Sequence, residues 1–333
     1  VENPFNAENT FNKAENYVYI ETFKKCLTDN GSRYVVKLPF TENPIVLPDN
    51  YLLTKKRTEY LFKRLQKDEK LLKEYDAILS EYIKEGILQD VTNETNVTNC
   101  HYLSHRPVIK EDRLTTKIRI VFDASAKYHD KKSLNDILDK GPCLLPYLFD
   151  ILRLRIGKIG LIRDIKQAFL QICIEENDQN YLRLLWFDNV NNPVPKFKIL
   201  RFTRLVFGLS PSPCILNSTV KVHLEKYLND STKRDVISKL LRNLYVDDTT
   251  TSFNDSEEAF TFYQTAKLSM GEGNFQLRKW ASNDKYLEYK VNTFELNNEC
   301  NQSVSNELSF AETKIGNTHT INNPKCRFRC CSE

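Results

Sequence analysis

The sequence Tyr-Val-Asp-Asp at residues 245–248 constrains the fold of this chain more than any other segment. It follows an apolar run that contains Leu240, Leu241 and Leu244, and it precedes the β-branched residues 249–251. An apolar strand, two acidic residues and a second strand predict a β-hairpin with carboxylates at its tip. Asp also favours turns for local reasons, so the tetrapeptide alone is compatible with a plain turn.

A further acidic residue, Asp164, ends an apolar run at residues 159–162. If this run lies beside the hairpin in one sheet, Asp164, Asp247 and Asp248 converge. Like charges about 4 Å apart repel by about 4 kcal/mol at an effective dielectric constant of 20. No Lys or Arg lies within two residues of Asp247 or Asp248. Divalent cations are therefore the expected compensation, and paired cations catalyse phosphoryl transfer.

The overall composition selects no function. The chain has 333 residues, of which 41% are hydrophobic and 28% are charged, and its net charge is +4. These values allow two domains or one two-lobed unit, with nucleic acid among many compatible partners. No stretch reaches the ~18 apolar residues of a membrane span, so we expect no membrane contact.

Nine cysteines are scattered along the chain without a Cys-x-x-Cys pair. We expect free thiols in a reducing, intracellular compartment. The first residue is Val1 and the only methionine is Met270, so we expect an internal piece of a longer translation product.

The order of the expected elements predicts an α+β fold, with helices on one side of an antiparallel sheet. Residues 51–85 have a period near 3.6 and predict two helices with a break near residues 66–68. A later helix is expected with Ser212 as N-cap and Pro213 at its first position, and another from Asp255 with Glu258 as capping partner. Four strands are expected, the last two paired with each other: residues 102–109, 118–122, 181–187 and 197–202.

Several segments, in order, resemble the motifs of reverse transcriptases. Residues 161–172 are similar to the first catalytic motif of these enzymes, and residues 245–248 to their Tyr-x-Asp-Asp motif. Residues 206–213, Val-Phe-Gly-Leu-Ser-Pro-Ser-Pro, resemble the Phe-Gly-Leu motif of retrotransposon enzymes. The following segments complete a pattern that resembles BEL/Pao-type LTR retrotransposons: residues 115–125, 133–136 and 275–283.

The resemblance spans roughly residues 31–290 and implies the fingers and palm of a right-hand polymerase, with the palm an antiparallel sheet backed by helices. It implies an RNA- and DNA-directed DNA polymerase that transfers nucleotides from dNTPs to a primer 3′-OH on an RNA or DNA template. It also implies protease, RNase H and integrase regions elsewhere in a parent polyprotein, and a location in the cytoplasm, the nucleus or a virus-like particle. The regions it implies are an extended lead-in from the upstream polyprotein (1–50), a fingers-like region with N-terminal helices (51–157), a palm (158–295) and an irregular tail (296–333).

The resemblance also implies residue roles. Asp164, Asp247 and Asp248 would hold two Mg²⁺ ions, with Mn²⁺ as an alternative, and Asp248 would matter least. Phe169 would exclude a ribose 2′-OH by its bulk, although a core position is the alternative. Arg119 would pair with the incoming triphosphate, with Lys117 or Lys110 assisting. The remaining implied contacts are Phe207 and Gly208 to the nucleotide, and Tyr245, Arg278, Lys279 and Trp280 to primer or template, with a core position as the alternative for Trp280.

One feature departs from the pattern. After residues 312–316 the expected continuation is lost, so we expect a truncated or frameshifted tail. A catalytically inactive retroelement remnant, acting at most as a nucleic-acid-binding module, is therefore the competing hypothesis. A zinc site at Cys100, His101 and His105 is not expected, because their spacing fits no standard site.

Overall fold

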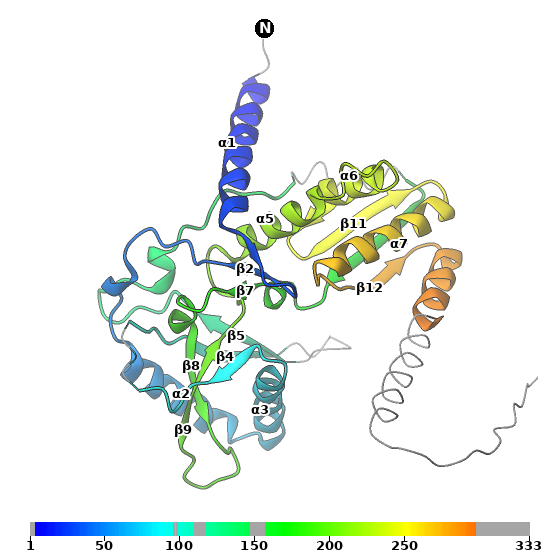
Figure 1. Ribbon diagram of the computed structural model, residues 1–333. Helices are drawn as coiled ribbons and strands as arrows, with labels where there is room; N and C mark the ends of the chain where they lie inside the picture. Colours follow the sequence, from blue (N-terminus) through cyan, green and yellow to red (C-terminus); the bar gives the residue numbers. More distant parts are fainter. Residues whose placement is uncertain (1–3, 96, 98, 110–117, 147–156, 298–333) are drawn as a thin grey trace, which may run out of the picture.

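Two groups of strands and helices lie side by side in the molecule, and the N-terminal helix projects from between them (Figure 1). The computed structural model describes residues 4–95, 97, 99–109, 118–146 and 157–297, and for residues 4–13 it describes the backbone. The helices are α1 (Pro4–Cys26), α2 (Tyr51–Leu65), α3 (Glu69–Lys84), α5 (Ser212–Glu225), α6 (Arg234–Asn243) and α7 (Ser256–Glu272), with short η1 (Pro44–Val46), η2 (Leu134–Ile137), η4 (Ala168–Gln171) and η5 (Gln179–Leu182), and a helix at residues 285–297. The strands are β1 (Thr28–Asp29), β2 (Tyr34–Val36), β3 (Leu88–Asp90), β4 (Ser104–Ile109), β5 (Ile118–Asp123), β6 (Ile159–Ile165), β7 (Cys173–Ile174), β8 (Arg183–Phe187), β9 (Phe197–Phe202), β10 (Leu244–Tyr245), β11 (Asp248–Phe253) and β12 (Leu277–Ser282).

One half of the molecule is built on a four-stranded antiparallel sheet in the order β10-β11-β6-β12. Along β6, Leu161, Arg163 and Ile165 are buried, whereas Ile162 is 49% exposed. Successive side chains of a strand point to opposite faces, so one face of this sheet is packed and the other is open. Helix α7 covers the packed face, where Phe262 contacts Phe253 of β11. The predicted α+β arrangement, with helices on one side of an antiparallel sheet, is confirmed for this half.

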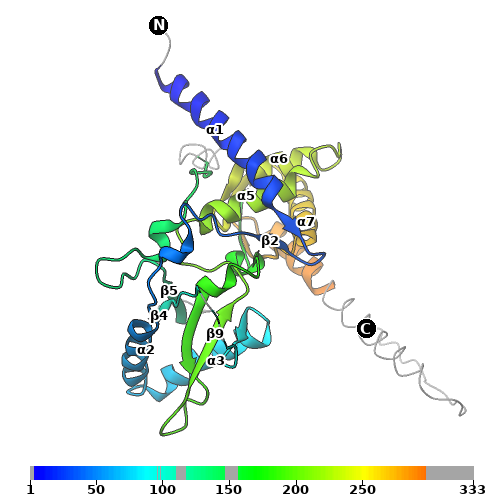
Figure 2. The ribbon, with the colours of Figure 1, turned by 60° about the vertical axis from the view of Figure 1, so that its left-hand side comes forward.

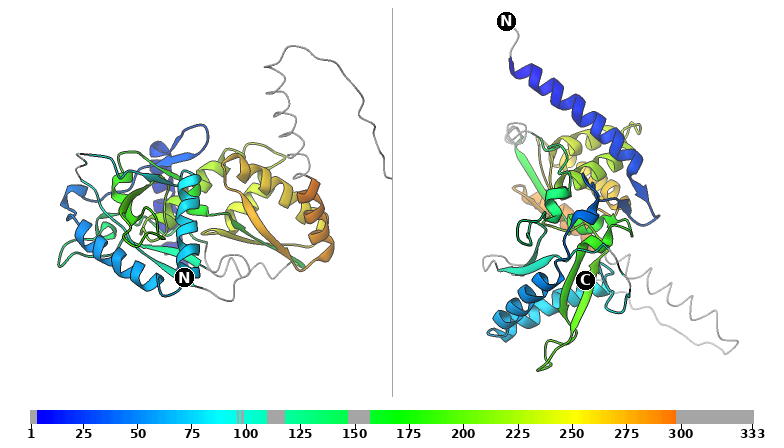
Figure 3. Two further views of the ribbon diagram at one scale, coloured as in Figure 1. Left: turned by 90° about the horizontal axis from the view of Figure 1, so that it is seen from below. Right: turned by 90° about the vertical axis from the view of Figure 1, so that its left-hand side faces the viewer.

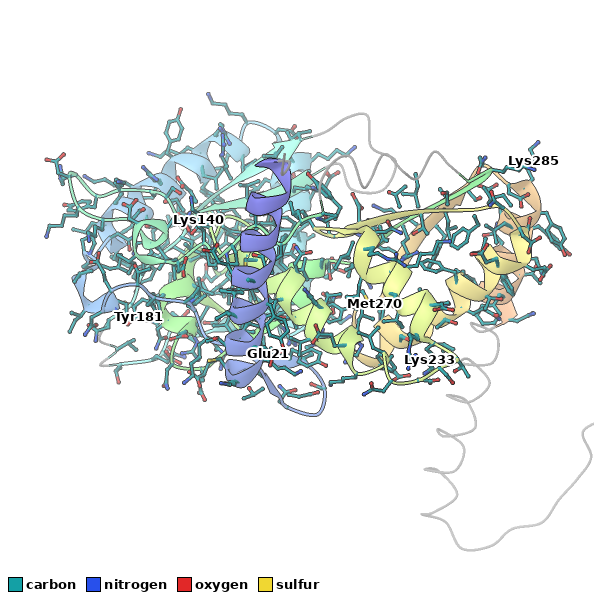
Figure 4. All side chains as sticks on the ribbon, turned by 90° about the horizontal axis from the view of Figure 1, so that it is seen from above. Glu21, Lys140, Tyr181, Lys233, Met270 and Lys285 are labelled. Atoms are coloured by element: carbon teal, nitrogen blue, oxygen red, sulfur yellow. The ribbon has the colours of Figure 1, made fainter. Side chains whose placement is uncertain are left out.

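The other half contains the sheet β3-β9-β8 and the pair β4–β5, packed against α2 and α3 (Figure 3, left). The predicted break between the two helices is confirmed: Asp68 caps α3 by accepting a hydrogen bond from the Leu71 N–H at 3.0 Å. The predicted pairing of the last two strands is also confirmed, with Leu184 opposite Leu200. Side chains fill both halves, as Figure 4 shows around the labelled Tyr181 in one half and Met270 in the other.

The N-terminal segment differs from the extended lead-in that we expected at residues 1–50. Residues 4–26 form the 23-residue helix α1, which packs across α5 (Figure 2). Ile20 of α1 is buried, and Val36 of β2 enters the core where β2 pairs in parallel with β7. The sequence signal was weak because most side chains of residues 14–26 stay at least partly exposed, and the contact with α5 cannot be seen in local periodicity.

The start of α5 also differs from the prediction. The N-cap is Pro211, and Ser212 lies inside the helix with its hydroxyl donating to the Val206 carbonyl at 2.7 Å. Ser212 is 2% exposed, and a buried hydroxyl needs a hydrogen-bond partner. The Ser212 hydroxyl therefore bonds to the preceding loop and does not cap the helix. The predicted cap of α7 is confirmed, since Asp255 accepts from the Glu257 and Glu258 N–H groups. Glu258 does not complete the capping box and instead pairs with Lys239 at 3.2 Å.

Asn135 connects the end of β5 to the loop that precedes α5. Its side-chain amide donates to the Ser125 hydroxyl and to the Gly208 carbonyl, both at 2.8 Å. Its side-chain oxygen accepts from the Ser210 N–H at 2.9 Å. These bonds give a structural reason for the Ser-Leu-Asn-Asp segment at residues 133–136: it holds together two loops that are distant in sequence.

Five described cysteines, Cys26, Cys100, Cys143, Cys173 and Cys214, are free thiols, as predicted. Among the helices of the described ranges, none has the length and apolar character of a membrane span. The expected irregular tail lies, from residue 298 onward, outside the described residues.

We predict that Gly208→Ala lowers the free energy of unfolding by about 2–4 kcal/mol, measured by chemical denaturation. Gly208 has φ +103°, and an added Cβ would lie 2.1 Å from the Phe122 carbonyl oxygen. Gly31 is the matched control, because it also has a positive φ, +84°, but nothing within 4 Å of an added Cβ. We expect Gly31→Ala to cost only about 1 kcal/mol. Equal effects of the two substitutions would contradict the close approach of Gly208 to β5.

Candidate active site

A single row of residues crosses all four strands of the β10-β11-β6-β12 sheet. Tyr245 lies opposite Asp248, Asp248 lies opposite Asp164, and Asp164 lies opposite Arg278. Directly opposed residues of neighbouring strands share one face, and this face is the open one that carries Ile162. The register therefore confirms that the segments around Asp164 and the hairpin are neighbours in one sheet.

The predicted hairpin is confirmed, and its two-residue turn is Val246-Asp247. Val246 has φ +56°, which is uncommon for a β-branched residue and marks local backbone strain. Two contacts hold the turn in place: Val246 packs against the core, and the Asp247 carbonyl accepts a hydrogen bond from the Ile165 N–H at 2.8 Å. That bond fixes Asp247 beside the end of β6, one residue beyond Asp164.

Asp164 is paired with two cations of β12. Its Oδ1 lies 3.2 Å from the Arg278 Nε, and its Oδ2 lies 3.2 Å from the Lys279 Nζ. Consecutive residues of a regular strand point to opposite faces, so both could not normally reach one carboxylate. A bulge between Arg278 and Ala281, with φ +53° at Lys279, turns both side chains toward Asp164. The positive charges that compensate Asp164 thus come from β12, which lies far in sequence from residues 247 and 248.

The pKa of Asp248 is raised above its ordinary value, chiefly by burial and then by the negative charges of Asp247 and Asp164. Lys279 acts in the opposite direction and lowers it. Asp247 and Asp164 are therefore close enough for their charges to act on Asp248. Positive charge added near Asp248 would therefore stabilise its ionised form.

The fit of this site to a divalent cation is good in donor type and backbone register, since carboxylates are the ligands that Mg²⁺ prefers. As the side chains lie, however, no group of three His, Cys, Asp or Glu in the described parts of the chain is placed to hold a metal ion. The geometric reason is that both Asp164 oxygens face Arg278 and Lys279. Metal binding here would require Asp164 to give up these partners.

Phe169 lies in η4 and is only 2% exposed. Its ring packs edge-on against Phe207, with 4.3 Å between ring centroids, and Phe207 is 47% exposed. In this arrangement Phe207 presents the accessible ring of the pair, and Phe169 supports it from the core. The role of Phe169 in excluding ribose stays a prediction.

Arg119 is exposed on β5, opposite Val108 of β4, in the other half of the molecule. Within the described residues it makes no ion pair with an acidic side chain. An exposed guanidinium suits an anionic ligand, but the role of Arg119 stays a prediction. Lys110 and Lys117, the expected assistants, lie outside the described residues.

Trp280 packs into the helix-covered side of the sheet, with its ring 4.4 Å from that of Tyr263 between centroids. This contact favours the core alternative for Trp280 over a contact with primer.

Beside Trp280 lies Arg163, which was not among the residues predicted from the sequence. The guanidinium carbon of this fully buried side chain lies 4.8 Å from the Phe262 ring centroid and 5.2 Å from that of Trp280. Burial lowers the pKa of Arg163 to about 9. The aromatic faces stabilise the cation and tie β6 to α7 and β12.

Two of three comparisons with known proteins gave no match: no family model and no curated protein matches the chain. Among solved structures, the chain is similar to a foamy viral protease-reverse transcriptase dRH in complex with double-stranded DNA, at 19% sequence identity and a TM-score of 0.42. The similarity covers 59% of this chain and 28% of that chain. The functional proposal therefore depends on the row of residues across the sheet and not on this likeness.

We predict that Asp248→Asn raises the free energy of unfolding at pH 7 without divalent metal, by about 0.2–1 kcal/mol. The folded state raises the pKa of Asp248, so its ionised form costs stability above the unfolded-state pKa of about 3.9. The gain should shrink as the pH falls through the raised pKa and vanish below about 3.9. Urea unfolding at several pH values measures it. A destabilised variant at pH 7 would contradict the repulsion among the three carboxylates.

Proposed function

We propose that this chain is the fingers-palm part of an RNA- and DNA-directed DNA polymerase, of the reverse transcriptase type found in BEL/Pao LTR retrotransposons. The observation that carries the proposal is the pairing of Asp248 with Asp164 across β11 and β6, beside a turn that holds Asp247. Two carboxylates on the open face of an antiparallel sheet, with a third in the adjoining turn, suit nucleotidyl transfer. The assignment to BEL/Pao depends on the sequence motifs.

Asp164, Asp247 and Asp248 would hold two Mg²⁺ ions, which would supply activation of the primer 3′-OH and charge neutralisation of the leaving pyrophosphate. Asp248 is the most exposed of the three, in agreement with its smaller expected contribution. When metal ions bind Asp164, Arg278 and Lys279 would leave this carboxylate. Their positive charges would then contact phosphates of the primer. Tyr245, 45% exposed in the same row, would pack against the primer strand.

The nucleotide would be bound between the two halves. Arg119 would pair with its triphosphate, because a guanidinium forms two parallel hydrogen bonds to phosphate oxygens. Phe207 and Gly208 would line the base and sugar pocket, and Asn135 would hold that loop in place through its bond to the Gly208 carbonyl. Phe169 would set the depth of the pocket from behind Phe207.

Primer extension on an RNA or DNA template with Mg²⁺ and dNTPs tests the proposal. We expect extension by the unmodified chain and a loss of at least about 100-fold in rate for Asp164→Asn and for Asp247→Asn. Asp248→Asn should lose less. Chelation of Mg²⁺ by EDTA should stop extension, and addition of excess Mg²⁺ should restore it.

Duplex binding, measured by fluorescence anisotropy, is the necessary control for this assay. If neither the unmodified chain nor Asp247→Asn extends the primer while both bind duplex equally, the catalytic proposal is wrong. The inactive nucleic-acid-binding remnant would then be the better account.

Phe169→Val tests the ribose exclusion. A smaller side chain behind Phe207 would let the pocket accept a 2′-OH, so the use of rNTPs relative to dNTPs should rise by about tenfold. Ile172→Ala is the control, because it removes three side-chain carbons from a neighbouring core position, against four in Phe169→Val. An unchanged ratio in Phe169→Val, with reduced thermal stability, would assign Phe169 to the core alone.

A further inference from the structure

A second concave site lies at the end of β6, two residues beyond Asp164. It is a cavity of about 270 Å³ whose lining includes Arg33, Glu85, Lys166 and Arg204. These residues come from four segments: the turn before β2, the end of α3, the end of β6 and the loop after β9. The Lys166 N–H donates to the Gln276 carbonyl at 2.8 Å, so the site lies where the β6–β12 pairing ends.

The cavity brings three cations together with one carboxylate. Arg33 and Arg204 are close enough that the charge of Arg204, after burial, lowers the pKa of Arg33. Glu85 acts in the opposite direction but is exposed at the rim. Like charges held together in a partly buried site are unfavourable unless an anion is added.

The two guanidinium groups are oriented by protein contacts that leave donors unused. Arg33 donates through Nη1 to the side-chain and backbone oxygens of Gln171, and the Gln171 amide donates to the Lys166 carbonyl at 2.8 Å. Arg204 donates through Nη1 to the Cys173 sulfur. The Arg204 Nε is buried and has no hydrogen-bond partner among the described residues. A buried charged donor without an acceptor is costly, so the protein only partly compensates the positive charge of Arg33 and Arg204.

We propose that this cavity binds a phosphate-type anion through Arg33, Arg204 and Lys166. Planar guanidinium groups match phosphate oxygens by parallel hydrogen bonds, and an ammonium adds a compact positive charge. Such an anion has two possible sources, a free phosphate compound or a phosphate of a nucleic-acid strand. The site goes beyond the proposed polymerase activity, since it involves none of the three carboxylates and requires no metal.

The test uses the full chain and two probes in metal-free buffer with EDTA. Inorganic pyrophosphate binding is measured by calorimetry, and binding of a single-stranded oligonucleotide by anisotropy. We expect Arg33→Ala and Arg204→Ala each to weaken binding of at least one probe by about tenfold. An effect on pyrophosphate indicates a free phosphate compound, and an effect on the oligonucleotide alone indicates a strand phosphate.

Two further variants control for charge and folding. Arg64→Ala removes an exposed guanidinium of α2 outside the cavity and should change pyrophosphate binding less than twofold. Glu85→Gln removes the one carboxylate of the lining and should tighten binding about threefold, even if the arginine variants fold poorly. The proposal is overturned if neither probe responds to Arg33, Arg204 or Glu85 substitution. Asp164→Asn should leave both probes bound, so a failure of the polymerase proposal would be distinguishable.

Discussion

The antiparallel pairing of β6 with β11 is the constraint on which the rest of the candidate site depends. A shift of one residue would move Asp164 to the helix-covered face and place Arg163 on the open one. The packed face prevents such a shift, because Leu161, Arg163 and Ile165 are buried there against α7 and its neighbours. Arg163 contributes through its contacts with the rings of Phe262 and Trp280. The core therefore sets the register, and the register brings the carboxylates together.

Charge balance explains the irregular backbone around the site. Opposed carboxylates on neighbouring strands repel, and regular strands would bring only one residue of β12 to Asp164. The bulge with its positive φ at Lys279 brings a second cation to the same carboxylate. The positive φ of Val246 is held by core packing and by the bond from Ile165 to Asp247. Backbone strain at Val246 and Lys279 thus occurs where charged side chains come close together, as is common at functional sites.

Polar contacts at the loop of residues 207–210 add to the hydrophobic core that the two halves share. Asn135 bonds to both Ser125 and Gly208, and Gly208 has no room for a side chain beside Phe122. This arrangement fixes the exposed ring of Phe207 between the β4–β5 pair and η4. A loop held this firmly can place a ligand with little loss of entropy on binding.

The sequence by itself determined the local elements of the protein: the hairpin at residues 244–253, the break at Asp68, the paired strands β8 and β9, and the cap at Asp255. Each depends on signals from neighbouring residues, namely periodicity, capping side chains and turn residues. The tertiary structure alone decided the rest. Helix α1 is defined by its contact with α5, the partners of Asp164 come from a bulge more than a hundred residues away, and the cluster of Arg33 and Arg204 joins distant segments. Such features arise from packing and charge between segments far apart in the chain, and no local pattern contains them.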